Sequence, residues 1–66
     1  MNAKEQRAWL AGRDVAVARL RSMAALYRAY SERAERAGDS EAQVTMWNHG
    51  ETLLDAARAI ESDVLP

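Results

Sequence analysis

The chain has no cysteine and no phenylalanine, and its single proline is the last residue. Without cysteine it can form neither a disulfide nor a zinc–thiolate site, and it is compatible with a reducing compartment. No stretch approaches the roughly 18 consecutive apolar residues that a membrane span requires, and the first residues lack the apolar core of a signal peptide. We therefore expect a soluble, cytoplasmic protein.

The short length of the chain limits its core. Sixty-six residues make one domain, and a core of that size rarely supplies more than about 3–5 kcal/mol of stability without a staple. Hydrophobic residues are 48% of the chain, but 14 of these 32 residues are alanine, which favours helix over every other structure. The composition predicts an all-α fold, and self-association is the remaining way to stabilise it.

A long amphipathic pattern runs from Ala8 to Ala37 without an interrupting proline. At about 100° per residue, its apolar residues form one band, made of Trp9, Ala16, Leu20, Met23, Tyr27, Tyr30, Ala34 and Ala37. The pattern predicts one helix over about 3–37, with Asn2 and Glu5 as its capping box. Gly12 lies inside this band, so we expect an unbroken helix and the close approach of another backbone or ring there. A kink is the alternative.

A turn signal separates two helices. Gly38 suits the left-handed position after a helix, and Ser40 resembles the cap of the next one. We therefore predict a turn over 38–40 and a second helix over about 41–63. A link this short folds the helices into an antiparallel hairpin. The second helix has an apolar inner face made of Met46, Trp47, Gly50, Leu53, Leu54, Ala57, Ile60 and Val64.

The hairpin register gives Gly50 a packing role and leaves the first helix overhanging. Folding about the turn places Gly50 level with Tyr27, so a small residue would face a large one. The overhang cannot be covered by the shorter second helix. We therefore expect two hairpins to dock as a four-helix bundle, with a partner or dimer interface made of Trp9, Leu10, Val17, Leu20 and Tyr27.

Charge is divided between the two halves. Residues 1–37 carry eight basic and four acidic side chains, a balance of +4, and residues 38–66 carry one basic and six acidic ones, a balance of −5. Complementarity within a hairpin or a dimer explains this division, and a basic surface for a polyanion is the alternative reading.

Polar breaks in the apolar bands suggest one structural ion pair. Arg19 interrupts the band of the first helix and Glu61 that of the second, within about one turn of each other in the hairpin register. We predict that they form a pair that fixes the register. An arginine held for a carboxylate or phosphate of a partner is the other interpretation. On the outer side of the first helix, Arg7, Arg21 and Arg28 form a candidate polyanion face.

No residue pattern indicates catalysis, a cofactor or a metal. His49 is the only histidine, and neither residue four positions away is a metal-binding type, so we expect a structural or surface role. The four aromatic residues follow the apolar bands, which favours packing over base stacking. Trp9 is the exception, because the overhang makes it either a dimer contact or a docking residue for another protein.

We therefore expect a non-enzymatic protein–protein interaction module that acts through a helical surface as a homodimer, with no cofactor, no metal and an unidentified protein partner. Its small size and its arginine and alanine usage suggest a phage-type inhibitor of a host machine, such as an anti-CRISPR protein. The alternatives are a regulatory protein that contacts nucleic acid through the arginines of the first helix, and a structural assembly subunit.

Overall fold

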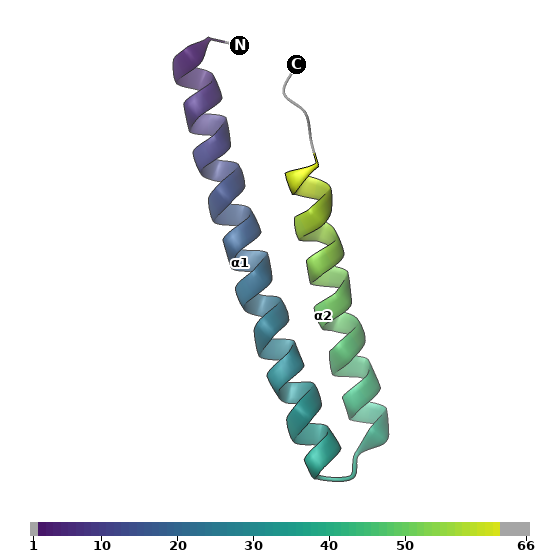
Figure 1. The fold of residues 1–66 in the computed structure, drawn as a ribbon. Helices are drawn as coiled ribbons and strands as arrows, with labels where there is room; N and C mark the ends of the chain where they lie inside the picture. The colour runs from purple at the N-terminus through teal and green to yellow at the C-terminus, as the bar shows by residue number, and fades with distance from the viewer. Residues whose placement is uncertain (1, 63–66) are drawn as a thin grey trace.

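The computed structural model describes residues 2–62, which form two α-helices and the turn between them. Helix α1 spans Ala3–Arg36 and helix α2 spans Ser40–Glu61, and they run antiparallel side by side (Figure 1). The predicted all-α hairpin is confirmed. The predicted end of the second helix at residue 63 and the predicted inward position of Val64 fall outside the described residues.

The start of α1 has the predicted capping box. The side chain of Asn2 accepts a hydrogen bond from the backbone N–H of Glu5 at 2.8 Å, and the Glu5 carboxylate accepts one from the Asn2 N–H at 3.3 Å. These two bonds satisfy donors that a helix N-terminus otherwise leaves without partners. The helix then continues unbroken through Gly12, as predicted.

The turn follows from two residues with special backbone roles. Gly38 has φ of +76°, the left-handed conformation that glycine adopts without a Cβ clash. The cap of α2 is Asp39, one residue before the predicted Ser40, because the Asp39 carboxylate accepts a hydrogen bond from the Ala42 N–H at 3.1 Å. Acidic residues suit this position, where the helix dipole is positive.

The hairpin is elongated and unequal in length. Its radius of gyration is 15.8 Å, whereas a compact chain of this length has about 11 Å. At 1.5 Å per residue, α1 is about 51 Å long and α2 about 33 Å. The N-terminal part of α1 therefore extends past the end of α2 (Figure 1).

The seam between the helices is lined by small residues at seven-residue spacing. Val17 and Ala24 on α1 and Ala57 on α2 are the buried hydrophobic residues of the described chain, with exposed fractions of 5%, 1% and 1%. Ser31 and Gly50 continue the two series and are also buried. No large side chain among residues 2–62 is fully buried. The hairpin alone therefore has a thin core.

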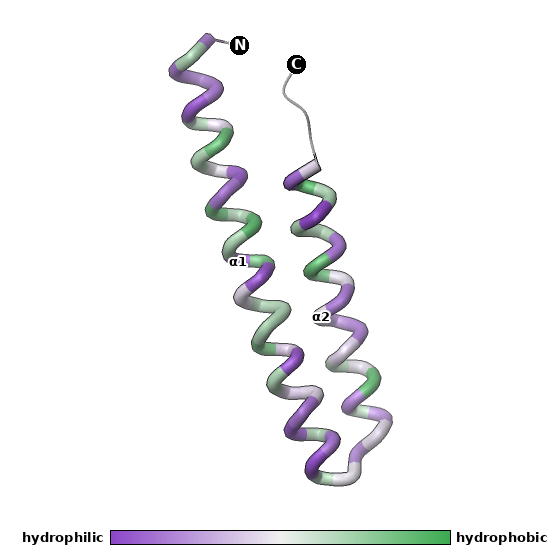
Figure 2. Tube along the Cα trace, viewed as in Figure 1, coloured by the Kyte–Doolittle hydropathy of each residue, from purple (hydrophilic) through white to green (hydrophobic). Residues whose placement is uncertain are grey.

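This seam corrects the predicted apolar band of α1. Met23 and Tyr30 are 42% and 41% exposed, whereas Ala24 and Ser31, each one residue further along, are buried. The buried face is rotated by about 70° from the predicted one. Hydrophobic and hydrophilic residues alternate along α1 (Figure 2), but helices that pack closely select a face of small residues rather than the most apolar face.

Candidate interaction surface

The hairpin has two faces of different chemistry. We call one the charged face, which comprises Arg21, Arg28, Trp47, Glu51 and Glu61. We call the other the uncharged face, because neither of the ion pairs across the seam lies on it; its exposed hydrophobic residues on α1 are Val15, Met23, Leu26 and Tyr30. Arg19 and Arg33 are also exposed on this side of α1.

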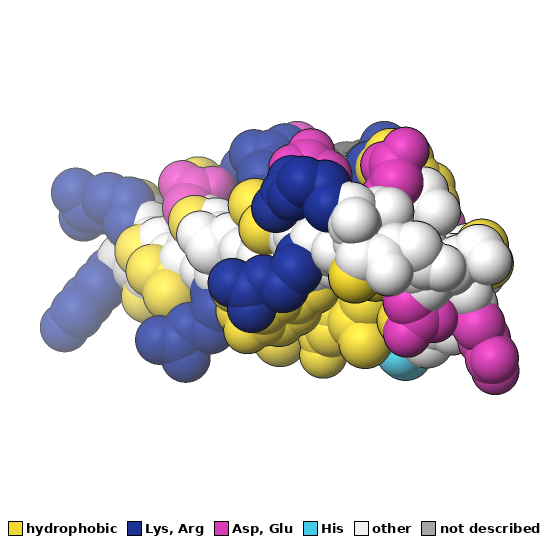
Figure 3. Space-filling model, turned by 90° about the horizontal axis from the view of Figure 1, so that it is seen from below, with side chains coloured by type: hydrophobic (Ala, Val, Ile, Leu, Met, Phe, Trp, Pro, Cys, Tyr) yellow, Lys and Arg dark blue, Asp and Glu magenta, His cyan; other side chains and the backbone are white. Residues whose placement is uncertain are grey.

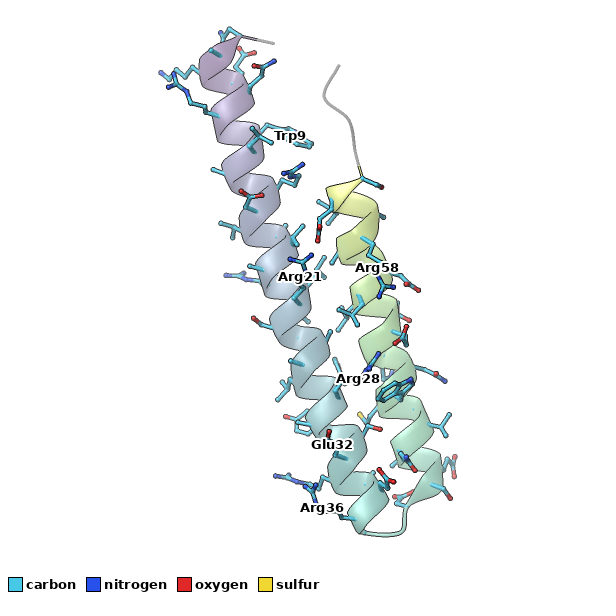
Figure 4. All side chains as sticks on the ribbon, viewed as in Figure 1. Trp9, Arg21, Arg28, Glu32, Arg36 and Arg58 are labelled. Atoms are coloured by element: carbon cyan, nitrogen blue, oxygen red, sulfur yellow. The ribbon has the colours of Figure 1, made fainter. Side chains whose placement is uncertain are left out.

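Arg28 is the centre of the charged face. Its guanidinium forms an ion pair with Glu51 and lies over the indole of Trp47, 3.4 Å from the ring centroid. Its side chain is 24% exposed. Figure 4 shows Arg28 reaching from α1 towards α2. An arginine stacked on an aromatic ring and paired with a carboxylate contributes both cation–π and ionic attraction across the seam.

Gly50 provides the space for Arg28. A Cβ added at Gly50 would lie 2.9 Å from the Arg28 Nε and 3.4 Å from the backbone oxygen of Ala24. Gly50 was predicted to permit the close approach of Tyr27, and that neighbour is wrong, because Arg28 and Ala24 lie against Gly50 instead. The ring of Tyr27 instead contacts that of His49, with 5.3 Å between centroids, because the seam passes on the other side of Tyr27.

Replacing Gly50 by alanine should therefore not stabilise the protein, although alanine favours a helix interior by about 1 kcal/mol over glycine. The added methyl group would displace the Arg28 side chain from Trp47. In an Arg28→Ala background, the same Gly50→Ala change should raise the melting temperature, because the obstructing side chain is gone. Thermal unfolding of the four proteins of this cycle checks the prediction. A rise in melting temperature from Gly50→Ala alone would show that Gly50 is not packed.

A second ion pair joins Arg21 of α1 to Glu61 of α2. The predicted partner of Glu61 was Arg19, and that prediction is wrong. The seam runs through Val17, Leu20 and Ala24, so Arg21 flanks it while Arg19 is exposed on another side of α1. Both ion pairs place an arginine of the basic half against a glutamate of the acidic half, within one hairpin.

The same pairs correct the candidate polyanion face. Arg21 and Arg28 were predicted to point away from α2, but each is paired with a carboxylate of α2. Arg7 is exposed on the overhang, about four helical turns from Arg21 and about six from Arg28. A phosphate would have to displace Glu51 and Glu61 to reach both paired arginines.

The uncharged face carries exposed hydrophobic side chains in one sector of α1. Val15 is 62% exposed, Met23 42%, Leu26 50% and Tyr30 41%, and at 100° per residue they lie within about 80° of one another. The Tyr30 ring contacts that of Tyr27 edge-on, and Tyr27 contacts His49 of α2. Figure 3 shows hydrophobic side chains beside the histidine along one edge of the molecule, with basic side chains to one side of them and acidic side chains beyond the histidine.

The residues predicted as a partner or dimer interface fall into three environments. Val17 was predicted to contact a partner or a second copy, but it lies in the seam with α2 of its own chain and is 5% exposed. Leu20 and Tyr27 are half-buried at the seam, and Trp9 and Leu10 are half-buried on the overhang. Arg13 lies over the Trp9 ring, 5.6 Å from its centroid, and Figure 4 shows Trp9 pointing to the side of α1 on which α2 lies.

Gly12 has no close neighbour in the hairpin. A Cβ added there would meet nothing within 4 Å, so the predicted approach of another backbone or ring to Gly12 does not occur within one chain. This glycine weakens the helix without a packing reason inside the hairpin.

The described part of the chain contains no cluster of three metal-binding side chains. A shallow, open hollow lies at the start of α2, lined by Asp39, Glu41, Ala42, Thr45 and Met46. Asp39 is already used there as the helix cap. Neither helix, over the residues described, is long and apolar enough to cross a membrane.

Comparisons with protein-family models, with curated proteins and with solved structures found no match to this chain. The class that the fold defines is an antiparallel two-helix hairpin with ion pairs on one face and exposed hydrophobic side chains on another.

Proposed function

We propose that the protein is a non-enzymatic protein–protein interaction module that acts as a homodimer. The observation that carries this proposal is the uncharged face, where Met23, Leu26 and Tyr30 remain exposed although the hairpin buries few hydrophobic side chains of its own. Contiguous exposed apolar surface of this kind is typical of interaction sites. Docking of two hairpins, which brings four helices together, covers it.

The surface area of the chain supports a dimer of ordinary size. The solvent-accessible surface is 4924 Å², whereas a compact monomer of this length has about 4200 Å². The excess of about 700 Å² is close to the roughly 800 Å² that each partner contributes to a standard protein–protein interface. A second copy can therefore cover the excess without a change of fold.

Thermal unfolding at several protein concentrations tests the proposal. If folding and dimerisation are coupled, the melting temperature rises with concentration, because the dimer is favoured by mass action. The double variant Trp9→Ala, Leu20→Ala should lose both helical content and the dimer, since it removes one side chain from the overhang and one from the seam. A melting temperature that is the same at every concentration would contradict the proposal.

One specific form of this function is inhibition of a host machine by a phage-type protein, such as an anti-CRISPR protein. The composition and the small size support it. Binding of the purified homodimer to a purified candidate target, measured by calorimetry, tests it for each target, and the absence of heat change at micromolar concentration would exclude that target.

The alternative of nucleic-acid binding through α1 has less support, because Arg21 and Arg28 are paired with carboxylates. Salt-dependent retention on immobilised DNA would favour it over the interaction module. A structural assembly subunit would instead form a large oligomer whose size does not depend on concentration.

A further inference from the structure

We propose that the two copies pair through α1 in antiparallel orientation, about a two-fold axis that passes close to Arg19. The contact surface is the part of the uncharged face that borders the seam, where Met23 and Tyr30 lie, and a second copy of this chain is its occupant. This geometry rests on the homodimer proposed above and specifies how that dimer is built.

The length of α1 places the axis. The helix runs from Ala3 to Arg36, so two antiparallel copies that overlap along their whole length are related by an axis at residues 19–20. A shorter overlap would leave part of each overhang uncovered. Full overlap lays the overhang of each copy along the C-terminal half of α1 of the other copy, which is the half that carries α2.

The side of α1 that carries Trp9, Ala16, Met23 and Tyr30 is self-complementary about this axis. In a two-fold interface, each residue before the axis meets the residue equally far beyond it in the other copy. The pairs that result are Trp9 with Tyr30, Gly12 with Tyr27, and Ala16 with Met23. Two of these pairs set a small residue against a large one, which permits close packing of two helices.

Two unexplained features of the hairpin find a reason in this pairing. Gly12, which meets nothing within 4 Å in its own chain, receives the Tyr27 ring of the second copy. Met23 and Tyr30, which are 42% and 41% exposed, are covered by the overhang of the second copy. The side of α1 that α2 does not cover is therefore the side that contacts α1 of the second copy.

The charges and the length of α2 are compatible with this arrangement. The ion pairs of Arg21 and Arg28 lie on the charged face, away from the dimer contact, and remain accessible to solvent. Between Ala8 and Tyr30, Arg19 is the one charged residue on the side of α1 that meets the second copy, and its two copies meet near the axis. Because α2 ends near the level of Arg21, each α2 packs along only one half of the pair of α1 helices. The dimer therefore differs from a bundle of four equally long helices.

A single introduced cysteine tests the geometry, because the chain has no cysteine of its own. Arg19→Cys places the two thiols of the dimer beside the axis and removes the like-charge contact there. Treatment with a short bis-maleimide should cross-link most of this variant into covalent dimers. The matched control is Arg33→Cys, the same change at an exposed position of α1, where the two thiols would be about 40 Å apart and should not be linked.

The outcomes separate this geometry from the proposed function. In a dimer with both turns at the same end, positions 19 and 33 lie equally far from their counterparts, so equal cross-linking of the two variants would overturn the antiparallel pairing. The pairing is also overturned if Arg19→Cys is not linked while sedimentation equilibrium shows a dimer, and the homodimer then stands. A monomer by sedimentation would overturn both.

Discussion

The Met23→Lys variant should lose the dimer at concentrations where the parent protein is fully dimeric. Met23 lies on the uncharged face and is 42% exposed in one hairpin, so a lone hairpin would tolerate a lysine there. In the dimer, each lysine would be removed from water one turn from Arg19, so it would meet like charge and no carboxylate. An uncompensated buried charge costs about 3–5 kcal/mol, which raises the dissociation constant of the dimer at least about a hundredfold. Sedimentation velocity measures this change directly.

Val44→Lys is the matched control. Val44 is also an exposed large hydrophobic residue, 57% exposed, but it lies on the side of α2 that faces away from α1. This variant should remain dimeric with an unchanged dissociation constant. Equal behaviour of the two variants, whether both dimeric or both monomeric, would show that Met23 is ordinary surface and would remove the uncharged face from the account.

The Ala24→Leu variant should lose most of its helical structure. Ala24 is 1% exposed, and its backbone oxygen lies 3.4 Å from where a Gly50 Cβ would be, so the two helices are close at this level. Larger side chains in such a packed site usually cost about 1–3 kcal/mol, which is a large part of the roughly 3–5 kcal/mol that a small core supplies. Far-ultraviolet circular dichroism during urea unfolding would report the loss.

The next residue provides the control for this change. Ala25 is exposed, and Ala25→Leu makes the same addition on a side of α1 that faces solvent. Its stability should stay within about 0.5 kcal/mol of the parent protein, as for most surface substitutions. If Ala24→Leu were tolerated as well as Ala25→Leu, the seam would not pass through Ala24.

The architecture could be predicted from the sequence because its signals are local. The capping pair of Asn2 and Glu5 and the left-handed Gly38 depend on neighbouring residues alone, and the long apolar repeat has no proline to break it. A helix end is fixed within one turn of chain, so its residues identify it without knowledge of the partner helix.

The rotation of α1 about its own axis could not be predicted in the same way. The most apolar face of α1 contains Met23 and Tyr30, and a hydrophobicity pattern selects that face whichever partner it serves. The face that contacts α2 is marked instead by small residues seven positions apart, namely Val17, Ala24 and Ser31. The helix therefore has two candidate contact faces, and the sequence does not say which of them packs against α2.

The error in the rotation explains the errors in the polar residues. Arg21 and Arg28 are seven residues apart and flank the observed seam, so each reaches a glutamate of α2. Relative to the predicted band, both arginines lie on the far side of α1, and Arg19 is the arginine nearest the predicted contact. The stacking of Arg28 on Trp47 could have been recognised only after the seven-residue spacing of the small residues was given precedence.

Sedimentation equilibrium of the unmodified protein at micromolar concentration tests the central claim most directly, because the thin core and the uncharged face both lead to a homodimer. The expected result is a mass twice that of one chain, with dissociation on dilution accompanied by loss of helical signal. A mass of one chain, with full helical content at every concentration, would contradict the account.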